Sequence, residues 1–162
     1  MIGINVPEFT LPATGGREVS LCSLRGEKLV LYFYPKDNTP GCTTESRDFA
    51  ALYDQFKALG CEVIGVSRDS IKSHEKFKEK LALPFDLISD AEQVLCEKMG
   101  VLKEKTIAGK TGYRIERSTF LLDTTGLVVQ AWRGVKVPGH AQAVLQFVQS
   151  MSSLGNRITK GV

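Results

Sequence analysis

The chain has 162 residues, a length typical of one domain, and its 21 Lys and Arg against 18 Asp and Glu leave a net charge of +3. The lysines of residues 72–80 alternate with glutamates, which argues against a nucleic-acid-binding surface. No apolar run is long enough to span a bilayer, and the first residues lack a signal-peptide pattern, so we expect a cytoplasmic protein. We expect residues 1–152 to form the domain and residues 153–162 to form a C-terminal tail.

The first half of the chain predicts alternating strands and helices. Short alternating segments on either side of Gly15 and Gly16 are typical of a hairpin. Two continuous apolar runs, residues 29–34 and Cys61–Ser67, are typical of strands buried in a parallel sheet. Apolar residues at helical spacing between these runs predict a helix that ends near Gly60.

The second half of the chain adds helices and a hairpin. Ser70 is expected to cap a helix over Ile71–Leu81, and Asp90 is expected to cap a helix that ends near Met99. Residues 103–113, rich in Lys, Thr and Gly, predict a mobile loop. The remaining predicted elements are a short strand over 85–88, a hairpin of 118–123 with 127–132, and a last helix after Pro138. This order predicts an α/β fold with a mixed central sheet and helices on both faces.

One cysteine stands at the start of a predicted helix. Cys42 falls in its first turn, with Thr39 at the expected N-cap and Pro40 at the first helical position. A helix N-terminus carries partial positive charge and unpaired N–H groups, so it favours the thiolate, which is the nucleophilic form. The polar loop before the helix predicts an exposed, activated sulfur rather than a buried structural cysteine.

A carboxylate on the same helical face would oppose such a thiolate. Glu45 lies three residues after Cys42, so we expect an arginine to neutralise it. The candidates are Arg47, Arg68, Arg114 and Arg117. Arg117 is favoured because it begins a strand that could lie beside the central strand, and it would also offer fixed donors to a substrate oxygen.

The remaining residues around Cys42 have structural and chemical interpretations. The Thr39 hydroxyl is expected to cap the helix and to contact the sulfur. Pro35 fixes the start of the loop and Pro40 its end, so that together they would shield the sulfur and leave it open from one side.

The other cysteines do not form a recognisable binding motif. Cys22 and Cys61 are expected to act as small apolar residues, and no C-x-x-C pair occurs. This argues against a disulfide reductase or electron carrier, which would need two neighbouring thiols. A metal-binding module is also disfavoured, because only His74 and His140 are present to complete a site. We therefore expect neither a metal nor another cofactor.

The residues Pro35, Thr39 and Cys42 form P-x-x-x-T-x-x-C, which resembles the active-site signature of peroxiredoxins. The longer string FYPKDNTPGCTTE resembles the Q-type, or bacterioferritin comigratory protein, branch, as do the segments EVIGVSRDS, LPFDLISD and RSTFLLD. The resemblance covers residues 3–151. It implies a thioredoxin-like fold, thiol-dependent reduction of hydrogen peroxide and organic hydroperoxides, and a role in antioxidant defence and redox homeostasis.

Carried over position by position, the resemblance assigns roles to five residues. Cys42 corresponds to the peroxidatic cysteine, which cycles through a sulfenic acid. Thr39 and Arg117 correspond to the residues that position the peroxide and activate the thiolate. Pro35 shields the sulfur, and Glu45 orients the arginine.

The chain departs from this branch at the resolving cysteine. Many Q-type members carry it five residues after the peroxidatic cysteine, where this chain has Arg47, and others carry it in the helix that matches Ile71–Leu81, which has no cysteine. Cys96 is then the first internal candidate and Cys61 the second, each requiring local unfolding. We favour a one-cysteine cycle with an external thiol such as glutathione, glutaredoxin or thioredoxin. The branch also implies a monomer.

Overall fold

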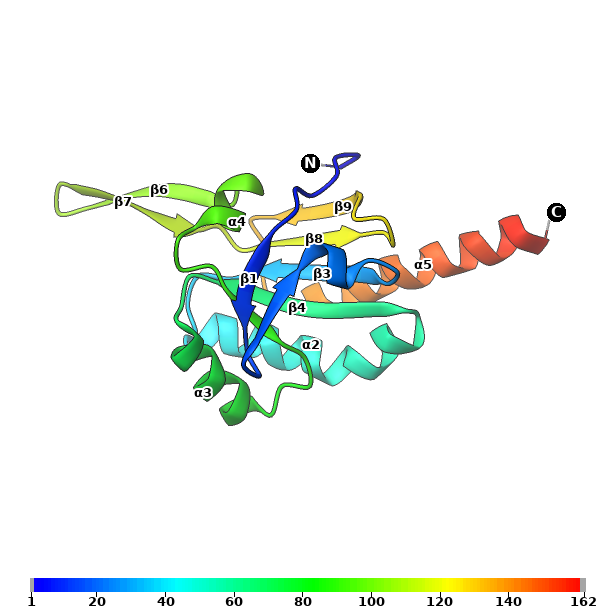
Figure 1. The fold of residues 1–162 in the computed structure, drawn as a ribbon, viewed down its shortest axis with the longest axis horizontal. Helices are drawn as coiled ribbons and strands as arrows, with labels where there is room; N and C mark the ends of the chain where they lie inside the picture. Colours follow the sequence, from blue (N-terminus) through cyan, green and yellow to red (C-terminus); the bar gives the residue numbers. More distant parts are fainter. Residues whose placement is uncertain (1, 161–162) are drawn as a thin grey trace.

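Among the residues that the computed structural model describes, 2–160 for the backbone and 2–151 for side chains, seven strands form one mixed sheet in the order β2-β1-β5-β4-β3-β8-β9 (Figure 1). These strands are β1 (Thr10–Ala13), β2 (Arg17–Ser20), β3 (Lys28–Phe33), β4 (Cys61–Ser67), β5 (Leu87–Ser89), β8 (Ser118–Leu122) and β9 (Val128–Arg133). A separate two-stranded ribbon is formed by β6 (Leu102–Ile107) and β7 (Lys110–Ile115). The described helices are α1 (Leu21–Leu24), α2 (Pro40–Ala58), α3 (Ile71–Leu81), α4 (Val94–Lys98) and α5 (His140–Lys160).

β3 lies inside the sheet because it is apolar on both faces. It pairs in parallel with β4 and antiparallel with β8. Val30 and Tyr32 point to one face, while Leu31 and Phe33 point to the other, and all four are fully buried. The predicted buried parallel strands are therefore confirmed.

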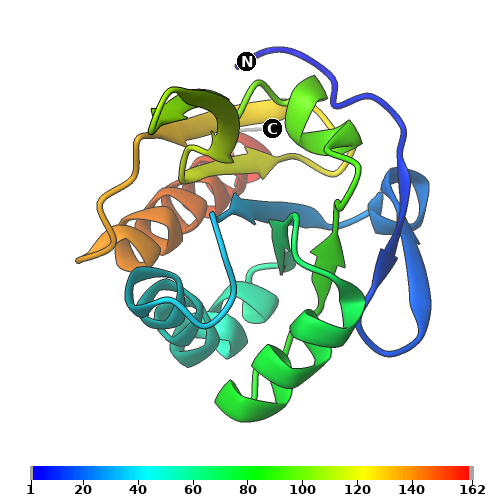
Figure 2. The same cartoon turned by 90° about the vertical axis from the view of Figure 1, so that its left-hand side faces the viewer.

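Two hydrophobic clusters cover the two faces of the sheet. Phe49 and Phe56 of α2 pack on one face together with residues of α3 and α5, and Figure 2 shows α2 and α5 side by side there. Leu95 of α4 packs on the opposite face, together with the N-terminal segment and Phe120 of β8. This arrangement confirms the predicted α/β fold with helices on both faces and an N-terminal hairpin.

Two predictions about local structure are wrong. Residues 103–113 are not a loop: they form most of β6 and β7, joined at Ala108 and Gly109, which both have positive φ. Both faces of this ribbon are largely exposed, so its sequence lacks the apolar alternation that signals a strand. The fourth helix begins at Val94 rather than directly after Asp90, whose carboxylate instead accepts a hydrogen bond from the Cys96 N–H at 2.7 Å.

The last helix continues past position 152. The tail expected over 153–162 falls on residues whose side chains lie outside the described part of the chain, and the backbone is described only to Lys160. None of the described helices combines the length and the apolar character needed to cross a bilayer.

Candidate active site

The loop between β3 and α2 places Cys42 at the third residue of the helix. The Thr43 N–H donates to the Thr39 carbonyl at 2.9 Å, so the first helical turn closes around the cysteine. Cys42 is only 1% exposed, and the prediction of an exposed sulfur is therefore wrong. Its burial comes from tertiary packing: Cys42 belongs to the cluster under α2, and the Arg117 side chain lies against its sulfur.

Arg117 connects the sulfur to Glu45. Its Nη2 donates to the Cys42 Sγ at 3.3 Å, and its Nη1 donates to the Glu45 Oε1 at 2.7 Å. The sheet explains this meeting, because Phe33 at the end of β3 pairs with Ser118 at the start of β8. Arg117, one residue before β8, thus lies beside the loop that follows β3. The expected neutralisation of Glu45 by Arg117 is confirmed.

The ionisable side chains of this site are largely buried. Burial raises the pKa of Glu45 to about 7, although the charge and hydrogen bond of Arg117 lower it; Asp48 adds a smaller upward effect. Burial lowers the pKa of Arg117, but the neighbouring Glu45 and Cys42 together raise this pKa by more. The pKa of Arg117 therefore lies above its ordinary value. Arg117 therefore remains a cation, held by two hydrogen bonds and shared between a carboxyl group and a sulfur.

Gly41 allows the arginine to approach the helix closely. A Cβ at this position would lie 3.1 Å from the Arg117 Nη2, closer than ordinary van der Waals contact. The backbone of Gly41 does not have a positive φ, so the need for glycine here comes from the guanidinium and not from a turn. Sequence reasoning missed this role because the neighbour of Gly41 is distant in the chain.

Thr39 does not cap the helix through its side chain, contrary to the prediction. Its backbone occupies the N-cap position, but its hydroxyl donates to the Lys36 carbonyl at 2.8 Å. The loop folds back on itself, so that this carbonyl accepts the hydrogen bond of the Thr39 hydroxyl. The hydroxyl oxygen retains its capacity to accept a hydrogen bond. Pro35 is half-buried at the start of the same loop.

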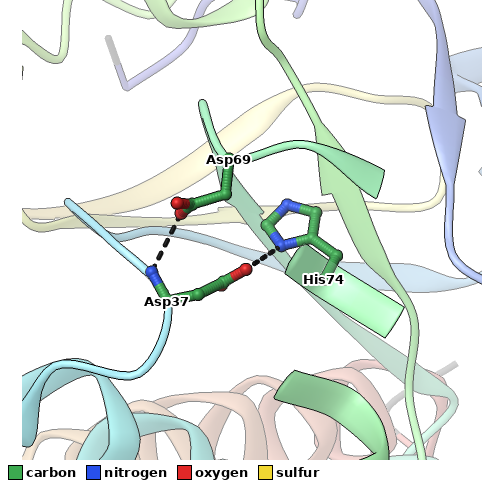
Figure 3. Close-up of side chains that lie close together, drawn as sticks. All are labelled: Asp37, Asp69 and His74. Atoms are coloured by element: carbon green, nitrogen blue, oxygen red, sulfur yellow. Dashed lines mark hydrogen bonds and ion pairs between the residues drawn. The ribbon is translucent and has the colours of Figure 1, made fainter. Parts of the chain in front are cut away.

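Asp37 fastens this loop to the neighbouring strand and helix (Figure 3). Its carboxylate accepts hydrogen bonds from the Tyr34 hydroxyl at 2.6 Å, the Ser73 hydroxyl at 2.8 Å and the His74 Nδ1 at 2.7 Å. Its backbone N–H donates to the Asp69 carboxylate at 2.9 Å. Asp69 follows β4, and Ser73 and His74 lie in α3, so two separate elements hold the loop that precedes Cys42.

The imidazole of His74 is fully buried and bonded at both nitrogens. Its Nε2 lies 2.9 Å from the Ile88 carbonyl, which can only accept, so this nitrogen carries a proton. One ligand atom each from Asp37, Asp69 and His74 lie within 4.8 Å of one another, a set of residue types that metals use. His74 already hydrogen-bonds the Asp37 carboxylate, and the Asp69 carboxylate already accepts from the Asp37 N–H. The cluster therefore has a structural role, which is to hold the loop against β4 and α3. Sequence reasoning missed it because its members are far apart in the chain.

Replacing His74 with alanine is expected to lower the free energy of unfolding by about 3 kcal/mol or more, because it leaves a cavity and removes a hydrogen-bond partner of the buried Asp37 carboxylate. Urea unfolding followed by circular dichroism measures this change. His74→Gln, which retains a donor, should recover part of the loss. Lys72→Ala, at an exposed position of α3, is the control and should change the stability by less than about 0.5 kcal/mol. A similarly small effect of His74→Ala would contradict the assigned role.

The structure brings neither internal resolving candidate to Cys42. Cys61 begins β4, beyond the far end of α2, which extends about 24 Å from Cys42 to its last residue. Cys96 packs on the opposite face of the sheet from Cys42. Burial raises the pKa of the Cys61 thiol to about 12, and burial together with Asp90 raises that of Cys96. All four cysteines are free, and Cys22 is the exposed one.

Comparison with known proteins identifies the family. The profile of the AhpC/TSA family matches residues 2–131. "Peroxiredoxin Bcp" of Xanthomonas campestris is 53% identical over 138 residues, 85% of this chain and 86% of that protein, and "Peroxiredoxin Bcp" of Bacillus subtilis is 47% identical over 151 residues, 93% and 96% of the two chains.

Solved structures agree with this match. The bacterioferritin comigratory protein of X. campestris superposes with a TM-score of 0.86 at 50% identity, covering 89% of this chain and 92% of that one. A cysteine-to-serine mutant of PrxQ from Xylella fastidiosa superposes with a TM-score of 0.89 at 44% identity, covering 94% and 97%. From the site and these matches together, the chain belongs to the AhpC/TSA family, as a peroxiredoxin of the Bcp or Q-type branch and hence a thiol-dependent peroxidase.

Proposed function

We propose that this peroxiredoxin reduces hydrogen peroxide and organic hydroperoxides with Cys42 as its peroxidatic cysteine. The observation that carries the proposal is the Arg117 guanidinium, which contacts the Cys42 sulfur and is held in place by Glu45. A fixed cation 3.3 Å from the sulfur can stabilise negative charge on it, and low solvent access strengthens this attraction. The structural study of the X. campestris relative concerns an alkyl peroxide reduction activity, which supports organic hydroperoxides as substrates.

The first step transfers one oxygen atom to the sulfur. The Cys42 thiolate attacks the distal oxygen of the hydroperoxide, forming an S–O bond as the O–O bond breaks. The product is Cys42 sulfenic acid, and the electron pair of the O–O bond leaves with the alkoxide or hydroxide, which takes up a proton to become an alcohol or water. Arg117 donors stabilise the negative charge that moves from sulfur to this leaving oxygen.

The surrounding residues position the hydroperoxide and the Arg117 guanidinium for this oxygen transfer. The Thr39 hydroxyl oxygen can accept a hydrogen bond from the hydroperoxide, because its own O–H already donates to the Lys36 carbonyl. Glu45 orients the guanidinium through a 2.7 Å hydrogen bond. Pro35, half-buried at the start of the loop, limits the access of water to the sulfur.

The second half of the cycle uses an external thiol. A reductant thiol condenses with the sulfenic acid to give a mixed disulfide and water, and a second thiol then attacks that disulfide and releases the Cys42 thiol. The burial and positions of Cys61 and Cys96 favour an external source, namely glutathione, glutaredoxin or thioredoxin, over an internal disulfide. Excess peroxide would instead give the inactive sulfinic acid.

We also propose that the protein acts as a monomer in the cytoplasm, without a nucleic-acid or membrane partner. The four free cysteines suit a compartment that keeps thiols reduced. The resemblance to the Q-type branch supports a monomer.

The stoichiometry of peroxide consumption tests the proposed function. Without a thiol, each chain should rapidly consume one hydroperoxide, because the sulfenic acid has no reductant, and only the slower oxidation to the sulfinic acid can follow. Adding dithiothreitol should give continuous turnover with one thiol pair oxidised per peroxide. Turnover that continues without thiol, or no consumption by the reduced protein, would contradict the proposal.

A further inference from the structure

The ribbon of β6 and β7 projects from the body of the protein, as the left side of Figure 1 shows. Only its base is anchored: Leu102 and Ile115, which pair with each other, are half-buried and buried, respectively. The residues from Lys103 to Arg114 are exposed. Most of the ribbon therefore contributes nothing to the hydrophobic core, and its two faces are open to a partner.

One face of the ribbon carries all four of its cations. Cross-strand partners lie on the same face, and alternate residues of a strand share a face. Along this face the cross-strand pairs are Lys103 with Arg114, Lys105 with Gly112, and Ile107 with Lys110. The four cations therefore share one surface, here named the basic face: Lys103, Lys105, Lys110 and Arg114. The single acid of the two strands, Glu104, lies on the other face with Tyr113.

The chain does little to neutralise the basic face. Lys103 lies 4.0 Å from Glu116, at the limit of an ion pair. Among the side chains that the structure describes, no carboxylate is within that distance of Lys105, Lys110 or Arg114. Like charges directly opposite each other, as Lys103 and Arg114 are, destabilise a pair of strands. An acidic partner would remove this repulsion.

The ribbon stands next to the reactive sulfur. Its second strand ends at Ile115, two residues before Arg117, which contacts Cys42. The loop between β3 and α2 lies at the same end of the molecule as the ribbon, as the two views in Figures 1 and 2 agree. A protein bound to the ribbon would consequently lie over the site that its thiol must reach.

We propose that the basic face is the docking surface for a protein thiol reductant with an acidic surface around its reactive cysteine. This inference rests on the proposed function, since it names the partner of the second half of the cycle. Complementary charge steers the encounter and raises its rate, and it orients the partner over the Cys42 site. Small neutral thiols need no such surface.

The test compares two variants with the same change in net charge. Lys105→Glu/Lys110→Glu leaves the basic face with two cations and two anions, which cancels its charge, and Arg25→Glu/Lys72→Glu changes exposed residues outside the ribbon. Turnover is measured with a thioredoxin of acidic net charge and, separately, with dithiothreitol. The ribbon variant should lose about tenfold in kcat/KM for thioredoxin and most of its dependence on ionic strength, while dithiothreitol supports equal turnover in all three proteins.

Three results would overturn the docking proposal: thioredoxin kinetics within twofold of the control variant, an equal loss with dithiothreitol, or binding of duplex DNA that the ribbon variant loses while thioredoxin kinetics stay unchanged. Single-turnover oxidation of Cys42 by peroxide, without any thiol, is measured in the same proteins. If that step fails in the unmodified chain, the proposed function itself is wrong, and this outcome is distinct from a failure of docking.

Discussion

Replacing Cys42 with serine is expected to abolish thiol-dependent peroxide reduction, with a loss of at least about a thousandfold. A serine hydroxyl beside Arg117 is not ionised near neutral pH and cannot form a stable sulfenic acid equivalent. The substitution removes one buried sulfur but keeps the size of the side chain, so the fold should persist. The initial rate of hydroperoxide consumption with dithiothreitol measures the effect.

Each remaining cysteine supplies a matched control for this substitution. Cys22→Ser changes an exposed thiol and should retain full activity. Cys61→Ser and Cys96→Ser replace fully buried thiols with a more polar side chain, so they are expected to lower the stability while the activity of the folded fraction remains. Activity that survives in Cys42→Ser, or that disappears in Cys22→Ser, would contradict the assignment of the nucleophile.

Replacing Arg117 with lysine is expected to slow the oxidation of Cys42 by about a hundredfold. Two different nitrogens of the guanidinium contact Glu45 and the Cys42 sulfur, at 2.7 Å and 3.3 Å. A single ammonium keeps the charge but cannot reproduce this fixed geometry, and loss of one preorganised donor costs roughly a hundredfold or more in other enzymes. Stopped-flow measurement of the peroxide reaction without thiol isolates this step.

The control is Arg47→Lys, at an exposed position of the same helix as Cys42. It preserves the charge and should leave the oxidation rate constant unchanged. A rate for Arg117→Lys within threefold of the unmodified protein would show that charge alone is sufficient, and would contradict the role given to the guanidinium geometry.

The parts of this fold that the sequence predicts well are those with strong local signals. The apolar run before Pro35 identifies β3, and Ser70 marks the start of α3, where its side chain accepts from the Ser73 N–H as expected. The pairing of Arg117 with Glu45 was predictable as well, since a carboxylate beside a thiolate requires a cation and the hairpin strand starting at Ser118 places one there.

The parts that could not be predicted depend on contacts between distant residues. Burial of Cys42 follows from tertiary packing and from the contact with Arg117, which a polar loop does not reveal. The fastening of Asp37 to His74 joins positions separated by 37 residues. The ribbon that contains Lys105 has polar residues on both faces, and therefore no periodicity that distinguishes it from a loop.

Peptide mapping after one equivalent of hydroperoxide, without added thiol, tests the central claim most directly. The account predicts a sulfenic acid on Cys42 that glutathione captures as a mixed disulfide, with Cys61 and Cys96 unmodified. A disulfide between Cys42 and either of those cysteines would contradict the one-cysteine cycle. Oxidation at another residue with Cys42 intact would contradict the identity of the reactive sulfur.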